Sequence, residues 1–331
     1  MASGRLVTRL VVAGILHWRM SVLRSRTLRL VVSILILGAA CTAGSEDGDS
    51  NGVERKAPTA EKPFVPATDD FGDSLRTGLR PARIVSLNPA TTEILFALGA
   101  GNRLIGRTKY DLWPDSARLI PALGDGLRPN VEAVLGTRPD LVVLYASEDN
   151  RGAAGRLRAA GVSTLSIKID SIAEFRRGVH MLGAVLGDQG RARSVVDSVD
   201  RTLARVRAAT AGLSKPTVFW HVWDAPLITI GAGSFMNELV EIAGGRNVYA
   251  DLPAPSPTVS LEDVSKRNPD FILAGPIGAA QLAADPRWRI VAASRAGRVL
   301  TVDTLLVARP SVRLGEAALS LANLLHPGVI R

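Results

Sequence analysis

Aromatic side chains gather at two places in this chain of 331 residues, although Phe, Trp and Tyr together make up only 5% of it. Flat apolar rings suit stacking against a large macrocycle, and a neutral imidazole can ligate a metal centre. The first group is Tyr110 and Trp113. The second group is Trp220, His221 and Trp223, which Asp224 follows. We predict that these residues contact a large ligand. Core packing of the rings and a structural role for His221 are the alternatives.

Two glutamates occupy equivalent places in an internal repeat. The segment Val131–Leu144 returns as Leu261–Ala274 at a constant offset of 130 residues, so that Glu132 matches Glu262. Each glutamate stands near the start of a predicted short helix, which a proline turn and a buried strand follow. Exposed carboxylates on two matching helices would make an oriented, salt-dependent contact with a basic partner. The alternative is that each only complements the dipole of its own helix.

The repeat also predicts the fold. Helices alternate with apolar strands from Arg83 onward, which is typical of an α/β protein with parallel sheets. A second pair of similar segments, Leu98–Asn102 and Ala243–Asn247, has one member in each half of the chain. In both halves this segment precedes the first repeated segment. Between the two halves, apolar residues recur at helical spacing, and a helix of about 22 residues would span roughly 33 Å. We predict two Rossmann-like lobes that a long rigid α-helix joins, with a ligand cleft between the lobes where the strands end.

These patterns divide the globular body into three parts. We place the N-terminal lobe at residues 81–170, the bridging helix at residues 171–213 and the C-terminal lobe at residues 214–331. Residues 41–80 are rich in Gly, Ser, Asp, Glu, Pro and Thr, a composition that is typical of a flexible tether.

The net charge of +9 depends on the first 40 residues. This stretch holds six arginines and no acid, and the short apolar run Leu30–Leu37 leads to small residues before Cys41. Residues 1–40 are therefore predicted to be a secretory signal peptide, with Met20 as an alternative start. Their removal leaves 34 basic and 31 acidic residues, a net charge of +3, so a nucleic-acid partner is not expected.

Cys41 is the only cysteine, which excludes a disulfide framework and a multi-cysteine metal site. The residues around it resemble a bacterial lipobox, in which the cysteine is lipidated and becomes the new N-terminus. We expect Cys41 to anchor the chain to a membrane. Ordinary cleavage that leaves a free thiol is the alternative.

Signals of an enzyme are weak. The sequence has no Gly-x-Ser-x-Gly elbow, no His-Glu-x-x-His pair and no Walker A loop. Gly231–Phe235 is similar to a phosphate loop but lacks the third glycine of the dinucleotide fingerprint, so we expect a tight turn from a strand into a helix. We predict a binding protein rather than an enzyme, with an α/β cell-envelope hydrolase as the rival from another class.

Residues 82–327 resemble the helical-backbone class of substrate-binding proteins of bacterial ABC importers, the group that binds cobalamin, haem and ferric siderophores. The segments that carry the resemblance are Arg83–Gly99, Asn130–Glu132, Arg138–Val143, the predicted bridging helix, Glu241–Asn247 and Val259–Val264. Lys109–Pro114 and Pro255–Ser260 look most like the cobalamin-binding branch.

The resemblance implies a function outside the cytoplasm, in the cell envelope. The protein would capture a cobalt corrinoid, or alternatively haem or a ferric siderophore, and deliver it to an ABC permease with its ATPase. No intrinsic cofactor is expected, and the metal would belong to the ligand.

The resemblance also implies roles for single residues. Glu132 and Glu262 would dock onto arginines of the permease, and Tyr110 would be the best single ligand contact. Arg309, which stands before the last predicted helix, matches arginines that face acidic ligands in siderophore and haem relatives; a surface ion pair is the alternative. A tryptophan often found in the cleft loop of the second lobe is replaced here by Ser256, for which Trp223 would compensate.

Overall fold

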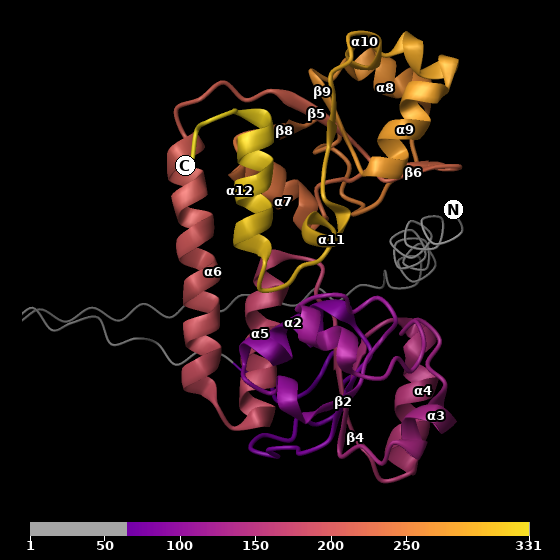
Figure 1. Ribbon diagram of the computed structural model, residues 1–331, viewed down its shortest axis with the longest axis vertical. Helices are drawn as coiled ribbons and strands as arrows, with labels where there is room; N and C mark the ends of the chain where they lie inside the picture. The colour runs from indigo at the N-terminus through magenta and orange to yellow at the C-terminus, as the bar shows by residue number, and fades with distance from the viewer. Residues whose placement is uncertain (1–64, 331) are drawn as a thin grey trace, which may run out of the picture.

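The computed structural model describes residues 65–330 (Figure 1). The predicted signal peptide, Cys41 and residues 41–64 of the predicted tether lie outside the described residues. Within residues 65–330, no helix combines the length and the apolar character that a membrane crossing needs.

The N-terminal lobe is built on a four-stranded parallel sheet with the spatial order β2-β1-β3-β4. Its strands are β1 (Ile84–Ser86), β2 (Leu104–Gly106), β3 (Leu141–Tyr145) and β4 (Ser163–Ile167). The helical segments that connect them are α2 (Pro89–Ala97), η2 (Gly101–Arg103), η3 (Asp115–Leu119), α3 (Val131–Gly136) and α4 (Glu148–Ala159). All of β1 and the first four residues of β3 are buried, as parallel strands covered on both faces must be.

The C-terminal lobe holds a second four-stranded parallel sheet, with the order β10-β9-β5-β8. Its strands are β5 (Thr217–His221), β8 (Arg246–Asn247), β9 (Phe271–Ala274) and β10 (Val299–Thr301), and a small antiparallel hairpin is formed by β6 (Trp223–Asp224) and β7 (Leu227–Ile228). The helical segments of this lobe are α7 (Phe235–Ile242), α8 (Leu261–Arg267), α9 (Pro276–Ala284), η4 (Pro286–Ile290), α10 (Ala292–Arg295), α11 (Thr304–Val307) and α12 (Leu314–Leu325).

The two sheets have the same topology, which confirms the prediction of two related α/β lobes. When β1, β2, β3 and β4 are matched with β5, β8, β9 and β10, both sheets have the spatial order second, first, third, fourth. The repeated aspartate has the same role in each lobe. Asp140 accepts hydrogen bonds from the backbone N–H groups of Ala82 and Arg83, and Asp270 accepts one from the N–H of Thr217. Each aspartate thereby fastens the start of its lobe's first strand to the start of the third.

Two helices that pack on each other, α5 (Ile172–Leu186) and α6 (Gln189–Thr210), stand between the two sheets in the chain. Gly187, in the left-handed conformation with a φ of 76°, ends α5, and the Asp188 side chain caps the start of α6. Figure 1 shows α5 beside the N-terminal lobe, whereas α6 runs along one side of the molecule from this lobe to the other. The predicted bridging region, residues 171–213, is therefore a helical hairpin whose second arm, α6, makes the crossing.

The upper half of α6 packs on α12 of the C-terminal lobe (Figure 1). Gly315 permits this close approach, because a Cβ atom at that position would lie 2.7 Å from the Cβ of Thr202. The buried face of α6 that both lobes cover consists of Ala192, Val196, Val199, Leu203 and Val206. One helix thus contributes to the packing of both lobes.

The N-terminal lobe begins earlier than residue 81, so the predicted limit of the tether needs correction. Asp69 is buried and accepts a hydrogen bond from the N–H of Ser166 on β4. Asp70 forms an ion pair with Arg177 of α5 at 2.6 Å. The polar composition of residues 65–80 suggested a tether, but these acidic side chains satisfy donors of the lobe instead.

Candidate functional site

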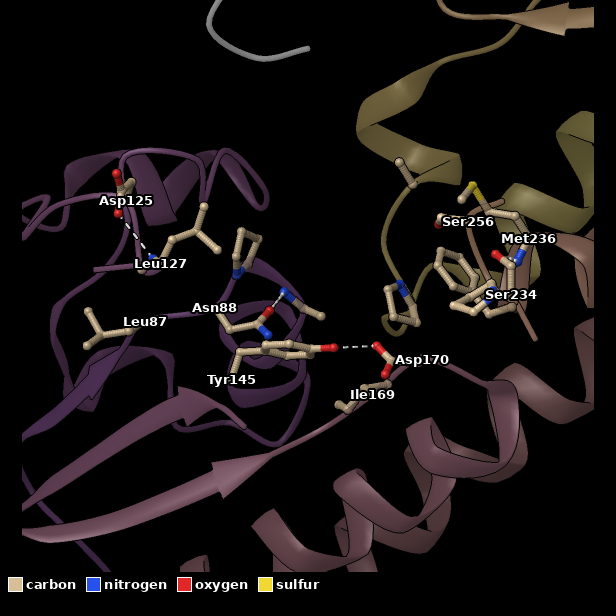
Figure 2. A pocket seen from close by; sticks show the side chains of 17 residues that line it. Leu87, Asn88, Asp125, Leu127, Tyr145, Ile169, Asp170, Ser234, Met236 and Ser256 are labelled. Atoms are coloured by element: carbon tan, nitrogen blue, oxygen red, sulfur yellow. Dashed lines mark hydrogen bonds between the residues drawn. The ribbon is translucent and has the colours of Figure 1, made fainter. Parts of the chain in front are cut away.

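A cleft lies between the lobes, at the carboxyl ends of the parallel strands of the first sheet (Figure 2). It encloses about 1030 Å³ of empty space, open solvent included. The first lobe contributes the residues that follow its strands, chiefly Leu87, Asn88, Tyr145, Ile169 and Asp170. The second lobe contributes Ser234, Phe235, Met236, Pro255 and Ser256. In α/β proteins, ligands bind at this edge of the sheet.

A second cavity, which we call the side cavity, adjoins the cleft, because Met236 and Ala308 line both. It encloses about 1260 Å³ of empty space, open solvent included. Three of the predicted ligand residues line it: Trp220 and His221 from the end of β5, and Trp223 from the hairpin. The structure therefore brings the second predicted aromatic group together on one hollow surface.

His221 forms part of the wall of the side cavity. Its Nε2 atom has no hydrogen-bond partner within the described part of the chain, and the nearest carboxylate oxygen, on Asp224, lies 3.6 Å away. Burial lowers the pKa of His221, so the imidazole is neutral near pH 7. Its free lone pair can meet a metal centre or a donor. Asp224 itself lines an outer hollow beside Glu262 rather than the side cavity.

Tyr145 and Asp170 face each other across the cleft floor, and the sequence analysis did not identify either of them. The Tyr145 hydroxyl donates a hydrogen bond of 2.7 Å to Asp170, as Figure 2 shows. Burial raises the pKa of the Asp170 carboxyl to about 6, although Tyr145 and Lys168 act against this shift. Both residues come at or just after the end of a buried strand, which is the signal that would have found them.

We expect Asp170→Asn to stabilise the protein above pH 6 and to have little effect at pH 4. The folded-state pKa lies above the ordinary value of 3.8, so the neutral carboxyl is favoured in the folded protein, and stability is lost as the pH rises through about 6. Two pKa units correspond to about 3 kcal/mol, which is the upper limit of the gain. Thermal unfolding of both proteins at pH 4 and pH 8 measures it. If the stability difference between Asp170→Asn and the wild type were equal at pH 4 and pH 8, the raised pKa of Asp170 would be contradicted.

The turn before α7 brings Ser234 and Phe235 to the cleft. Gly231 is required there, because a Cβ atom would lie 2.1 Å from the carbonyl oxygen of Ala254 and 2.6 Å from that of Leu252. Ser234 caps α7, and the N–H of Phe235 donates to the carbonyl of Asp170 in the other lobe. The predicted tight strand-to-helix turn is confirmed, and it lies against the loop that carries Ser256.

Three residues predicted to bind ligand contact residues of the opposite lobe. Arg309 forms an ion pair with Glu93 of α2 at 3.2 Å and donates a hydrogen bond of 2.7 Å to the carbonyl oxygen of Tyr110. The guanidinium of Arg313 lies 5.1 Å from the ring centre of Trp113. We call this contact the clasp: Glu93, Tyr110 and Trp113 of the first lobe with Arg309, Ser311 and Arg313 of the second.

The clasp leaves Tyr110, Trp113 and Arg309 outside the lining of the two cavities, in the state that the structure describes. Tyr110 is only 8% exposed, and the side chain of Arg309 is 13% exposed. Their contact with a ligand remains a prediction.

The two repeated glutamates are exposed on the first turns of α3 and α8. Both helices lie on the side of the molecule opposite α6, one in each lobe (Figure 1). A backbone N–H group and, to a lesser extent, the hydroxyl of Ser260 lower the pKa of Glu262, so this carboxylate is ionised at neutral pH. The arrangement presents one negative charge per lobe to the same side of the protein.

The charged groups that line the cleft and the side cavity are acidic. Asp125 and Asp170 line the cleft, Asp303 lines the side cavity, and within residues 65–330 no lysine or arginine lines either. The same residues contain no cluster of three or more His, Cys, Asp or Glu side chains that could hold a metal ion. The site is therefore suited to binding a ligand whose periphery is neutral or donates hydrogen bonds.

Comparisons with known proteins agree with this architecture. The model of the periplasmic binding protein family matches residues 84–305. YvrC of Bacillus subtilis, an uncharacterized ABC transporter substrate-binding lipoprotein, is 30% identical over 314 residues, which cover 91% of this chain and 96% of that protein. A vitamin B12-binding protein of Salmonella choleraesuis is 30% identical over 197 residues, which cover 59% of this chain and 73% of that protein.

The fold also matches solved structures. The periplasmic heme-binding protein RhuT from Roseiflexus sp. RS-1 superposes with a TM-score of 0.68 at 24% identity, over 75% of this chain and 99% of that one. The relatives are solute-binding proteins rather than enzymes, so the rival hydrolase interpretation has no support. This chain belongs to the periplasmic binding protein family, and it is an ABC transporter substrate-binding protein of the group that includes cobalamin-, haem- and siderophore-binding proteins.

Proposed function

We propose that this protein captures cobalamin or a related corrinoid in the cleft between its lobes and delivers it to an ABC permease. The observation that carries the choice of ligand is the charge of the lining. Asp125, Asp170 and Asp303 face the two cavities, and within residues 65–330 no cationic side chain joins them. A cobalamin has neutral carboxamide side chains around its ring, whereas haem carries two carboxylates.

The chemistry of the two cavities also favours a large macrocycle. Met236 and Ala308 line both the cleft and the side cavity, so one large ligand could extend from one into the other. Amide groups of a corrinoid can donate hydrogen bonds to Asp125 and Asp170, while Trp220 and Trp223 offer apolar surface. The vitamin B12-binding relative supports the same ligand class.

Haem or another iron chelate is the second candidate, and one feature of the side cavity is compatible with it. The Nε2 atom of His221 is buried, lacks a partner among the described residues and belongs to a neutral ring on the side cavity. Such a nitrogen can ligate iron, although it can equally ligate the cobalt of a corrinoid.

The experiment compares three coloured probes on the full chain, purified in detergent. After mixing with cyanocobalamin, haemin or ferric enterobactin and desalting, we expect cyanocobalamin alone to remain in about one equivalent. If haemin or ferric enterobactin remained bound and cyanocobalamin did not, the second candidate, haem or another iron chelate, would be favoured. Retention of none, with no heat of binding by calorimetry, would contradict the macrocycle proposal as a whole.

We also propose how the protein meets its transporter. Glu132 and Glu262 would dock onto basic residues of the permease, since both are exposed and lie on one side of the two lobes. Lipidation of Cys41 would hold the protein at the outer face of the membrane, which the lipoprotein relative supports.

A further inference from the structure

The ion pair between Glu93 and Arg309 lies directly behind the wall of the cleft. Glu93 is 1% exposed, and the side chain of Arg309 is 13% exposed. The chain neighbours of Arg309, Ala308 and Pro310, both line the cleft. On the opposite side, Ala90 lines the cleft three residues before Glu93, one turn earlier on α2. Arg309 thus lies between two cleft-lining residues in the chain, and Glu93 lies one helical turn after another.

Glu93 holds the guanidinium of Arg309, whose chain neighbours line the cleft. One of its carboxylate oxygens accepts from the guanidinium of Arg309, and the other accepts from the hydroxyl of Ser311. The guanidinium of Arg309 also donates a hydrogen bond to the carbonyl oxygen of Tyr110. With Arg309 so occupied, the charged residues that line the cleft are Asp125 and Asp170, the second of which pairs with Lys168 at 3.3 Å.

We infer that Glu93 determines ligand specificity: it acts as an internal counter-ion that keeps Arg309 from binding ligands with carboxylate groups. An anionic ligand could reach this guanidinium only by displacing Glu93, which would leave a carboxylate buried and unpaired. A ligand with neutral amide side chains does not compete for Arg309. This inference deepens the proposed function and rests on it for the identity of the preferred ligand.

The test is Glu93→Gln, which keeps the shape of the side chain and an acceptor for Ser311 but removes the charge. We expect the ratio of haemin affinity to cyanocobalamin affinity, measured by equilibrium titration of the full chain in detergent, to rise at least tenfold. The dimethyl ester of haemin, which lacks the carboxylates, should gain less than threefold. An unchanged ratio, or an equal gain for the ester, would overturn the inference.

Two further variants separate the loss of a charge from the release of Arg309. Asp111 is also buried, at 1% exposure, but it is held by the hydroxyl groups of Thr92 and Thr108. The carboxyl of Asp111 feels the charge of Arg309 but takes its side-chain hydrogen bonds from the two threonines. Asp111→Asn therefore changes a buried carboxyl while Glu93 still holds the guanidinium, and it should change the ratio less than threefold. Glu93→Gln combined with Arg309→Gln should abolish the gain; persistence of the gain without Arg309 would overturn the inference.

The inference and the proposed function can fail separately. If the wild-type chain does not retain cyanocobalamin but Glu93→Gln still gains haemin over its ester, the proposed ligand is wrong and the role of Glu93 stands. If Glu93→Gln does not fold, Glu93→Asp keeps the charge but shortens its reach. That variant should show a smaller gain in the same direction, and no gain would contradict the inference.

Discussion

Replacing Arg309 with methionine lowers the free energy of unfolding by about 3–5 kcal/mol, because it leaves a buried carboxylate without its partner. Glu93 is 1% exposed and has Ser311 as its only other donor among the described residues. Burial raises the pKa of Glu93 above its ordinary value, so the carboxylate takes up a proton more readily in the folded protein than in the unfolded chain. The loss caused by Arg309→Met should therefore be large at pH 8 and shrink at acid pH, where Glu93 takes up a proton.

Denaturant unfolding followed by circular dichroism measures this effect, and a paired variant gives its control. Glu93→Met combined with Arg309→Met removes both charges, so it should cost little or even stabilise the protein, as replacement of buried ion pairs often does. Arg118→Met breaks an ion pair whose members are 52% and 98% exposed, and should cost under about 1 kcal/mol. If Arg309→Met cost no more than Arg118→Met, the clasp would not be a structural contact between the lobes.

Removing both repeated glutamates should reduce transport at least tenfold without changing ligand affinity. Glu132→Ala with Glu262→Ala deletes one carboxylate from each lobe on the side that would face the permease. Close charge pairs across an interface are worth about 1.5 kcal/mol or more, and each 1.4 kcal/mol changes binding tenfold. Uptake of labelled cyanocobalamin into proteoliposomes that hold the permease measures the effect, which should be larger at low salt.

A matched variant tests whether the position or only the charge matters. Asp197 on α6 and Glu241 on α7 are also exposed, but their helices lie away from α3 and α8. Asp197→Ala with Glu241→Ala also removes two negative charges, but from other helices, and should leave transport within twofold of the wild type. Equal losses from both double variants, or a loss of ligand affinity in the glutamate variant, would contradict docking through Glu132 and Glu262.

Much of the fold could be predicted because its signals are local. The repeat with offset 130 contains a helix start, a proline turn and a strand in each lobe, and the aspartates within it, Asp140 and Asp270, make equivalent contacts. Helix α6 runs from Gln189 to Thr210, and the Asp188 side chain caps its start. Apolar residues at helical spacing along this segment predict the helix. These features need no knowledge of distant parts of the chain.

The clasp could not be predicted from such signals. Glu93 lies within an apolar helix, and nothing near it in the sequence indicates that its partner is Arg309, 216 residues away. The same limit applies to the contact of Arg309 with the carbonyl oxygen of Tyr110, which joins residues 199 positions apart. The predicted tether had the composition of a linker, and only the fold shows that Asp69 and Asp70 meet donors on β4 and α5.

The account depends most on a corrinoid that occupies the cleft between the lobes. Titration of cyanocobalamin into the full chain in detergent tests this with two tryptophan variants. Ala308→Trp places an indole where the cleft and the side cavity meet, whereas Leu119→Trp places it at a site that is 87% exposed and lines neither. We predict saturation at one ligand per chain for the wild type and Leu119→Trp, and at least tenfold weaker binding for Ala308→Trp. Equal affinity of all three proteins, or no saturable binding to the wild type, would contradict the account.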